Sequence, residues 1–283
     1  MSDIFDDLIE NKKEEKKEEK KVEKKEVKTE KPSDNAIQDL VAPTTEPQKI
    51  DIEEETTGGK EVYVIYGDKG EGKTTFALSF PGEILALSFD RKTAPIRHNI
   101  YGDRKDIHVY DPVKVWKQTD DRIIVKTAKD VYDLIERIFA KYGENGVDWV
   151  VIDGTEVLEQ IAELTMRNNH GLTAYQGISN LNLWKERRRL INHIHNLALN
   201  TARKGVIYTL WTSLEQVITE GSVVEQRKVP KWVDIVMFES DYVINVYYKD
   251  GYYAKVMSSK NPNKVPVGEY NVTGKGITAI WES

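Results

Sequence analysis

The chain of 283 residues contains no cysteine, and this absence excludes disulfide bonds, thiol catalysis and thiolate metal sites. It also lacks an apolar run of about 18 residues, the length that a membrane span needs, and a short apolar segment near Met1. We therefore expect no contact with a membrane and no secretion signal. The five histidines do not have metal-ligand spacing. His193 and His195, for example, would lie about 200° apart on a helix and could not face one ion.

Apolar and charged residues are unevenly distributed along the chain. Hydrophobic residues make up 39% of it and charged residues 31%, which is little apolar material for a chain of this length. Residues 1–59 contain 11 lysines and 18 acidic residues, whereas residues 60–283 contain 30 basic and 29 acidic residues. The second part is almost neutral. This balance argues against coating of nucleic acid by bulk charge but permits a local basic groove.

Residues 1–58 have the composition of a disordered, charged tail. Lysine and glutamate alternate in doublets over residues 12–28, which places like charges four residues apart and disfavours the alternative, a long solvated helix. Near the start, Ile4, Phe5, Leu8 and Ile9 would form one apolar stripe if the segment folded. We expect either a docking peptide for a protein partner in residues 1–10 or a solvated leader without a partner. Residues 59–283 form one predicted domain.

A buried strand followed by a glycine-rich loop is predicted at the start of this domain. Residues 61–66 are mostly apolar, β-branched or aromatic, which is typical of a buried strand. The following residues match G-x-x-x-x-G-K-[ST], the phosphate-binding loop, and a short helix over residues 76–80 should come next. Glycines let backbone N–H groups face phosphate oxygens, Lys73 adds a positive charge, and the Thr74 hydroxyl suits Mg²⁺. The predicted nucleotide-binding residues of the loop are Gly67, Asp68, Lys69, Gly70, Glu71, Gly72, Lys73, Thr74 and Thr75.

Such a loop requires a second group, a carboxylate at the end of an apolar strand, on the metal side of the site. Residues 149–152 are Trp-Val-Val-Ile, and Asp153 follows them directly. The alternative is an aspartate that caps the next helix, which should begin near Glu156. Because the phosphate loop independently requires such a carboxylate, we predict that Asp153 and Thr74 hold the metal.

The order of the remaining predicted elements places Asp153 late in the sheet. Strands are predicted over residues 83–90 and 106–110, with a helix over residues 128–142 between them and the strand of Asp153. Asp153 therefore ends at least the fourth strand. In kinase and GTPase layouts, by contrast, the strand of the phosphate loop and the strand of the metal carboxylate are neighbours.

Downstream of Asp153, the sequence predicts a helix over residues 179–203, a strand over residues 205–213 and a hairpin over residues 241–257. With this order the chain resembles the RecA-like ATPases over roughly residues 60–281. More narrowly, it is similar to phage and archaeal-virus members linked to single-strand annealing and recombination. The expected fold is a three-layer α/β RecA-like P-loop NTPase core with a mostly parallel sheet and a C-terminal β hairpin.

The resemblance implies further site residues at two strand ends. Relatives place a glutamate that polarises the attacking water after the second or third strand, where this chain has Asp90 and Asp111. The alternative for Asp90 is a turn residue before two basic residues. Relatives also keep a polar sensor of the γ-phosphate, usually Gln or His, at the end of the fifth strand. This chain has Thr212 and Ser213 there.

Two lysines of the predicted hairpin match a third position of the relatives. RecA-like and hexameric helicase relatives have a lysine-rich strand end that reaches the nucleotide of a neighbouring subunit. Lys255 and Lys260 occupy this place, so the resemblance implies a catalytic role for them in a homo-oligomer, either a ring or a filament. The alternative is a pair of solvated lysines that protect an exposed strand.

Two segments are candidates for contact with single-stranded DNA. Residues 214–231 contain a predicted turn at Glu220 and Gly221, with Arg227, Lys228 and Lys231 behind it, and RecA relatives place a mobile DNA-binding loop there. Residues 167–177 are polar and lead into the helix predicted over residues 179–203. A few phosphate contacts and one stacked aromatic side chain are sufficient for such binding.

Together these features predict a cytoplasmic ATPase, in the host cytoplasm if the source is a virus. We expect it to bind ATP and Mg²⁺, to hydrolyse ATP, and to act on single-stranded DNA in replication or recombination. One alternative is an assembly or adaptor module in which ATP controls oligomerisation with little turnover. The other is a motor that translocates or packages DNA.

Overall fold

The computed structural model describes residues 59–219 and 222–283. Its strands are β1 (Glu61–Gly67), β2 (Ile84–Ser88), β3 (Ile107–Tyr110), β4 (Val147–Asp153), β5 (Ala202–Thr219), β6 (Ser222–Pro230), β7 (Tyr242–Tyr248), β8 (Tyr252–Ser259) and β9 (Gly268–Asn271). Its helices are α2 (Lys73–Ala77), α3 (Thr93–Ile100), the 3₁₀ helix η3 (Pro112–Val115), α4 (Asp121–Tyr142), α5 (Thr155–Asn169), α6 (Asn182–Thr201), α7 (Asp234–Glu239) and α8 (Thr278–Trp281). In this described part, no helix is long and apolar enough to cross a membrane. The predicted tail of residues 1–58 and its docking peptide lie outside the described residues.

The strands form one sheet in the order β3-β2-β4-β5-β1-β7-β8-β9, with β6 paired to β5. All pairs from β3 to β7 along this order are parallel, and the pairs β7–β8, β8–β9 and β5–β6 are antiparallel. Parallel strands need covered crossover connections, which explains why helices alternate with β1 to β5 along the chain. The predicted fold, a mixed α/β core with a mostly parallel sheet and a C-terminal hairpin, is confirmed.

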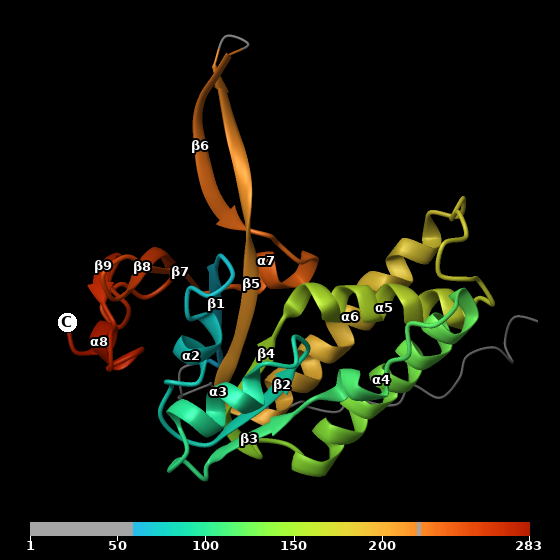
Figure 1. Cartoon of the computed structure of the whole chain (residues 1–283), viewed down its shortest axis with the longest axis horizontal. Helices are drawn as coiled ribbons and strands as arrows, with labels where there is room; N and C mark the ends of the chain where they lie inside the picture. Colours follow the sequence, from blue (N-terminus) through green and yellow to red (C-terminus); the bar gives the residue numbers. More distant parts are fainter. Residues whose placement is uncertain (1–58, 220–221) are drawn as a thin grey trace, which may run out of the picture. The chain divides into compact units, whose positions relative to one another are not determined.

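Each face of the sheet is covered by a separate hydrophobic core. Side chains of β1 alternate between the two, with Val62 and Val64 in one core and Tyr63 and Ile65 in the other. The first core contains apolar residues of α4, α5 and α6, which lie together beside β4 in Figure 1. The second contains residues of α2 and α8. Because both faces of the sheet are packed, the edge from which the phosphate loop emerges is held in a fixed position.

The long helix α4 begins seven residues before its predicted start. Asp120 caps it, because its carboxylate accepts hydrogen bonds from the backbone N–H groups of Arg122 and Ile123, both at 3.0 Å. Two charged residues open the first turn, Ile123 is exposed, and the first buried residue is Val125, so the regular apolar pattern begins later than the helix itself.

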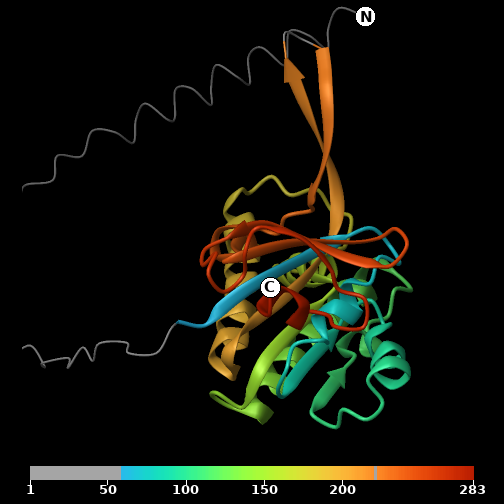
Figure 2. The ribbon, with the colours of Figure 1, turned by 90° about the vertical axis from the view of Figure 1, so that its left-hand side faces the viewer.

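The strand β5 differs most from its predicted extent. Instead of ending at residue 213, it continues to Thr219 and pairs with β6 from Thr212↔Pro230 to Thr219↔Ser222. Both views show the two strands extending well beyond the rest of the sheet (Figures 1 and 2). The predicted loop over residues 214–231 is therefore mainly a β hairpin whose root adjoins the phosphate loop.

Candidate functional site

The glycine-rich loop joins β1 to α2 at the carboxyl edge of the parallel strands. Gly70 and Gly72 both have a φ of 88°, a left-handed conformation that residues with a side chain rarely adopt. Gly72 also faces the ring of Tyr252 in β8, and a Cβ atom at this position would lie 2.9 Å from that ring. The loop thus needs glycine at position 72 for two reasons, the backbone conformation and the close approach of Tyr252.

Lys73 bridges the open side of this loop. Its ammonium group donates hydrogen bonds to the carbonyl oxygens of Gly67 and Asp68, both at 2.9 Å. Burial lowers the pKa of Lys73, and the carboxylates around it, Asp153 first among them, counteract this effect. The positive charge is therefore held against the backbone of the loop, where an anion such as phosphate would bind.

Asp153 lies beneath Thr74 at the end of β4, and its carboxylate accepts hydrogen bonds from three threonine hydroxyls. The Thr74 hydroxyl is 3.1 and 3.0 Å from the two carboxylate oxygens, the Thr209 hydroxyl is 2.7 Å from Oδ1, and the Thr93 hydroxyl is 2.5 Å from Oδ2. Asp153 is only 2% exposed. Burial raises its pKa, and the nearby charge of Asp90 adds to this effect, while the hydroxyls act in the opposite direction.

The order of the strands brings these three threonines together. β4 lies between β2 and β5, and Asp153 pairs with Ser88 on one side and with Thr209 on the other. Thr93 begins α3 a few residues after the end of β2. The sequence analysis did not single out Thr93 or Thr209, because nothing in a lone threonine indicates which strand will lie beside it.

Glu156 is a second, half-buried carboxylate that the sequence analysis did not assign to the site. It lies in the first turn of α5, and its Oε1 accepts a hydrogen bond from the backbone N–H of Trp211 in β5. Its Oε2 is buried without a hydrogen-bond partner among the described residues. Burial raises the pKa of Glu156, whereas the charges of Lys231 and Lys73 lower it. The only feature of the sequence that could have identified Glu156 is its position three residues after Asp153, the predicted metal carboxylate.

The two predicted candidates for activating water lie at different distances from the phosphate loop. Asp90 lies two residues after the end of β2, the neighbour of the strand of Asp153, and its Oδ1 accepts a hydrogen bond from the Lys92 backbone N–H at 2.9 Å. Arg91, between them, has a φ of 63°, a left-handed conformation that is uncommon for arginine. Asp111 follows β3, four strand spacings or about 19 Å from β1. The charge of Asp90 acts on the Asp153 carboxylate, whereas Asp111 follows a strand that lies two positions from β4 in the sheet.

The other predicted residues lie at two separate places. Thr212, in β5, adjoins the Asp68 carboxylate of the loop. Lys260 does not lie at the loop of its own chain: it forms an ion pair of 2.7 Å with Asp241, which binds the Val62 backbone near the opposite end of β1. Lys255 is exposed on β8, between Asn245 and Glu269. For both lysines, contact with a neighbouring subunit stays a prediction.

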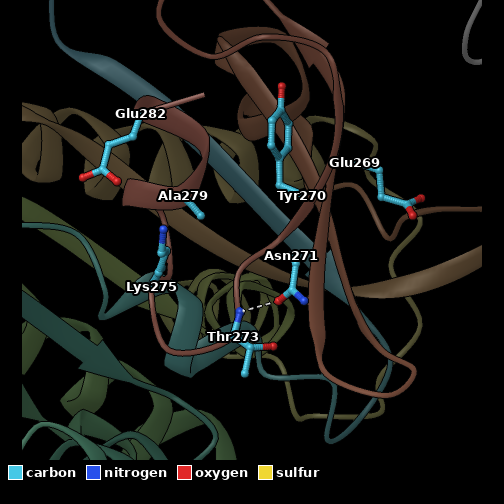
Figure 3. Close-up of a pocket in the computed structure, with 7 residues that line it drawn as sticks. All are labelled: Glu269, Tyr270, Asn271, Thr273, Lys275, Ala279 and Glu282. Atoms are coloured by element: carbon cyan, nitrogen blue, oxygen red, sulfur yellow. Dashed lines mark hydrogen bonds between the residues drawn. The ribbon is translucent and has the colours of Figure 1, made fainter.

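A cavity of about 490 Å³ adjoins the loop, and Asp153 does not line it. Gly72 and Thr75 line it from the loop, Tyr101 from the end of α3, and Tyr252 from β8. A more open cavity of about 590 Å³ lies farther along the C-terminal segment, between β9 and α8 (Figure 3). There Glu269 points away from Lys275 and Glu282, so its charged groups do not converge as they do in a ligand site. Of these two cavities, the first adjoins the phosphate loop.

The oxygen groups at Thr74 and Asp153 fit Mg²⁺ better than a metal bound wholly by protein ligands. In the described ranges, no group of three or more His, Cys, Asp or Glu side chains could hold a metal ion. Mg²⁺ usually takes one or two protein oxygens and completes its shell with phosphate oxygens and water. A threonine hydroxyl with a buried carboxylate behind it meets this requirement once a phosphate is present.

Comparison with known proteins agrees with the phosphate loop. No curated protein matches the sequence. The family model described as an AAA domain matches residues 60–268, which include β1, the loop, Asp153 and most of the sheet. This match covers most of the chain and supports a P-loop ATPase in general. The chain belongs to the AAA domain family.

Proposed function

We propose that this chain binds MgATP and hydrolyses it, and that it acts on single-stranded DNA. The observation that carries the ATPase proposal is the contact between Thr74 and Asp153. It places the last residue of the phosphate-loop motif directly above a carboxylate that is 2% exposed. Lys73, the preceding residue, faces into the loop. Family membership supports ATP binding independently of this contact.

Each group has a distinct part in the proposed reaction. Lys73 and the loop N–H groups bind the β- and γ-phosphates, while Thr74 and Asp153 hold Mg²⁺, which neutralises charge on the phosphate oxygens. Asp90 is the proposed group for orienting and deprotonating the attacking water, since it lies next to Asp153. The base and ribose would occupy the cavity of about 490 Å³ beside Gly72 and Tyr252.

The β5–β6 hairpin is the proposed contact with single-stranded DNA. It extends beyond the sheet and carries the exposed apolar side chains of Trp211 and Leu214, with Arg227 on the facing strand. Stacking on an aromatic side chain combined with a few cationic contacts is a common mode of single-strand binding. The second predicted segment is less suitable. Its first basic residue, Arg167, is buried and binds Glu163 and the Gln176 carbonyl.

A second candidate is an ATP-controlled assembly module with little turnover. The observation in its favour is the short side chain of Asp90, which is engaged with the Lys92 backbone. In this alternative a homo-oligomer forms when ATP binds, and residues 1–10 recruit a protein partner. Measuring ATP hydrolysis with and without single-stranded DNA separates the two. Stimulation by DNA supports the first proposal, and near-zero turnover with ATP-dependent assembly supports the second.

The experiment for the nucleotide site itself is the substitution Lys73→Ala. We expect it to abolish binding of a fluorescent ATP analogue and ATP hydrolysis, because the central positive charge of the loop is lost. Lys126→Ala is the matched control, since Lys126 is an exposed lysine on α4 in a different part of the fold. Unchanged ATP binding in Lys73→Ala would reject the proposed nucleotide site.

A further inference from the structure

Lys228 connects the β5–β6 hairpin to the phosphate loop. It lies in β6, opposite Leu214, and its ammonium group is 2.6 Å from the carboxylate of Asp68, the second residue of the loop. Its backbone carbonyl accepts a hydrogen bond of 3.4 Å from the Tyr66 hydroxyl, at the end of β1. The ion pair with Asp68 raises the pKa of Lys228. Lys228 was predicted as a DNA contact, but the structure places its charge at the loop.

The root of the hairpin is held beside the same loop by backbone contacts. Trp211 pairs with Gly67, the first glycine of the loop, and its N–H donates to Glu156. The Trp211 carbonyl accepts a hydrogen bond of 2.7 Å from the Lys231 N–H, where the chain leaves β6. The loop residues Gly67 and Asp68 thus contact both strands of the hairpin, β5 through Trp211 and β6 through Lys228.

The Lys228–Asp68 pair is suited to exchange of partners. The side chains are 51% and 48% exposed, and an ion pair this accessible to water adds little to stability. Both groups stand at the mouth of a loop that, on the proposed function, receives a polyanion. A terminal phosphate offers the lysine a stronger partner than a solvated carboxylate, since it carries more negative charge and presents three acceptor oxygens for charge-assisted hydrogen bonds.

We infer that Lys228 leaves Asp68 when a nucleoside triphosphate binds and contacts its terminal phosphate, so that the hairpin follows the state of the nucleotide. The inference rests on the proposed function. Asp68 is then a competitor of the γ-phosphate for one cation. A nucleoside diphosphate lacks the terminal phosphate that Lys228 would contact, so Lys228 would stay paired with Asp68.

Two substitutions with opposite expected effects test this exchange. Lys228→Ala should weaken binding of a fluorescent ATP analogue with Mg²⁺ by at least about tenfold, the usual effect of losing a charge-assisted hydrogen bond. The ADP analogue should change less than about twofold. Asp68→Asn should strengthen ATP binding, because the competing carboxylate is neutralised. Gln226→Ala, two residues along the same strand, is the control for a general disturbance of β6.

The double variant distinguishes exchange from simple repulsion. If Asp68 only repels phosphate, Asp68→Asn will strengthen ATP binding equally with or without Lys228. If the two compete, the gain from Asp68→Asn should disappear in the Lys228→Ala background. Equal gains in both backgrounds, or equal losses of ATP and ADP affinity in Lys228→Ala, would overturn the inference. The Lys73→Ala variant tests the proposed function separately from the exchange at Lys228, because retained ATP binding in that variant overturns the proposed function itself.

Hydrogen exchange gives a readout of the hairpin that does not depend on affinity. With saturating ATP and Mg²⁺, the backbone N–H groups of residues 226–229 should exchange at a different rate than with ADP. The difference should vanish in Lys228→Ala and persist in Gln226→Ala. Identical exchange in the ATP-bound and ADP-bound wild-type protein would contradict the coupling.

Discussion

The substitution Thr93→Val gives a quantitative test of the network around Asp153. Valine has nearly the shape of threonine, so the change removes the hydroxyl that lies 2.5 Å from Asp153 Oδ2 without leaving a cavity. Thr93 is fully buried, and no water replaces the lost donor. A hydrogen bond to a charged group contributes about 1.5–3 kcal/mol. We therefore expect the free energy of unfolding to fall by about 2 kcal/mol.

Thermal and urea unfolding, without nucleotide or metal, measure this loss. A folded part of about 225 residues has an entropy of unfolding near 0.47 kcal/mol/K, so 2 kcal/mol corresponds to a decrease in Tm of about 4 °C. Thr93→Ser keeps the hydroxyl and should lose less. In the presence of ATP, Thr93→Val should also raise the Mg²⁺ concentration needed for half-maximal hydrolysis, because the Asp153 carboxylate loses a donor that orients it.

Thr165→Val is the matched control for this experiment. Thr165 in α5 is also fully buried, but its hydroxyl has no hydrogen-bond partner within the described part of the chain. Removing an unpaired buried hydroxyl should leave stability unchanged or raise it. If Thr93→Val and Thr165→Val change the free energy of unfolding equally, the hydroxyl of Thr93 does not stabilise the Asp153 carboxylate and the reasoning is wrong.

Two further predictions concern other parts of the fold. His195 is buried 2.6 Å from the Tyr208 hydroxyl, and burial lowers its pKa. Below about pH 6.5 the unfolded chain binds a proton at this histidine that the folded chain does not. The free energy of unfolding should therefore decrease as the pH is lowered, by up to about 1.4 kcal/mol per pH unit. Urea unfolding at several pH values should show that the free energy of unfolding decreases less in His195→Phe than in the wild-type protein. An equal decrease in both would mean that other groups cause the pH dependence. Gly67→Ala should abolish ATP binding, because its Cβ would overlap the Val246 carbonyl oxygen, whereas Gly59→Ala, with open space around it, should bind normally.

Local sequence patterns identify two parts of the site, the phosphate loop and Asp153, but not the residues that connect these parts. The phosphate loop and the strand before Asp153 are each continuous segments, and their residue types alone indicate phosphate and metal chemistry. Thr93, Thr209 and Glu156 reach the site through the order of strands, in which β5 lies between β1 and β4. Threonine is common in strands and at helix starts, so neither Thr93 nor Thr209 stands out in the sequence.

The hairpin illustrates a second limit of sequence patterns. Residues 214–231 contain β-branched residues on both sides of Glu220 and Gly221, a pattern compatible with two strands. The resemblance to RecA-like ATPases favoured a loop at this place, and the described side chains of residues 213–216 and 226–228 are exposed, which gives no clear apolar face. Burial, the main signal for a strand, is weak where the strand projects from the sheet.

The length of β5 has a mechanical consequence. From Thr212, beside the loop, the strand continues to Thr219, a distance of about 23 Å at 3.3 Å per residue. Treated as a rigid lever pivoting near Trp211, it would convert a tilt of about 10° at the root into a movement of about 4 Å at the tip. A small rotation at the phosphate loop would thus become a displacement larger than a covalent bond at the far end of the hairpin.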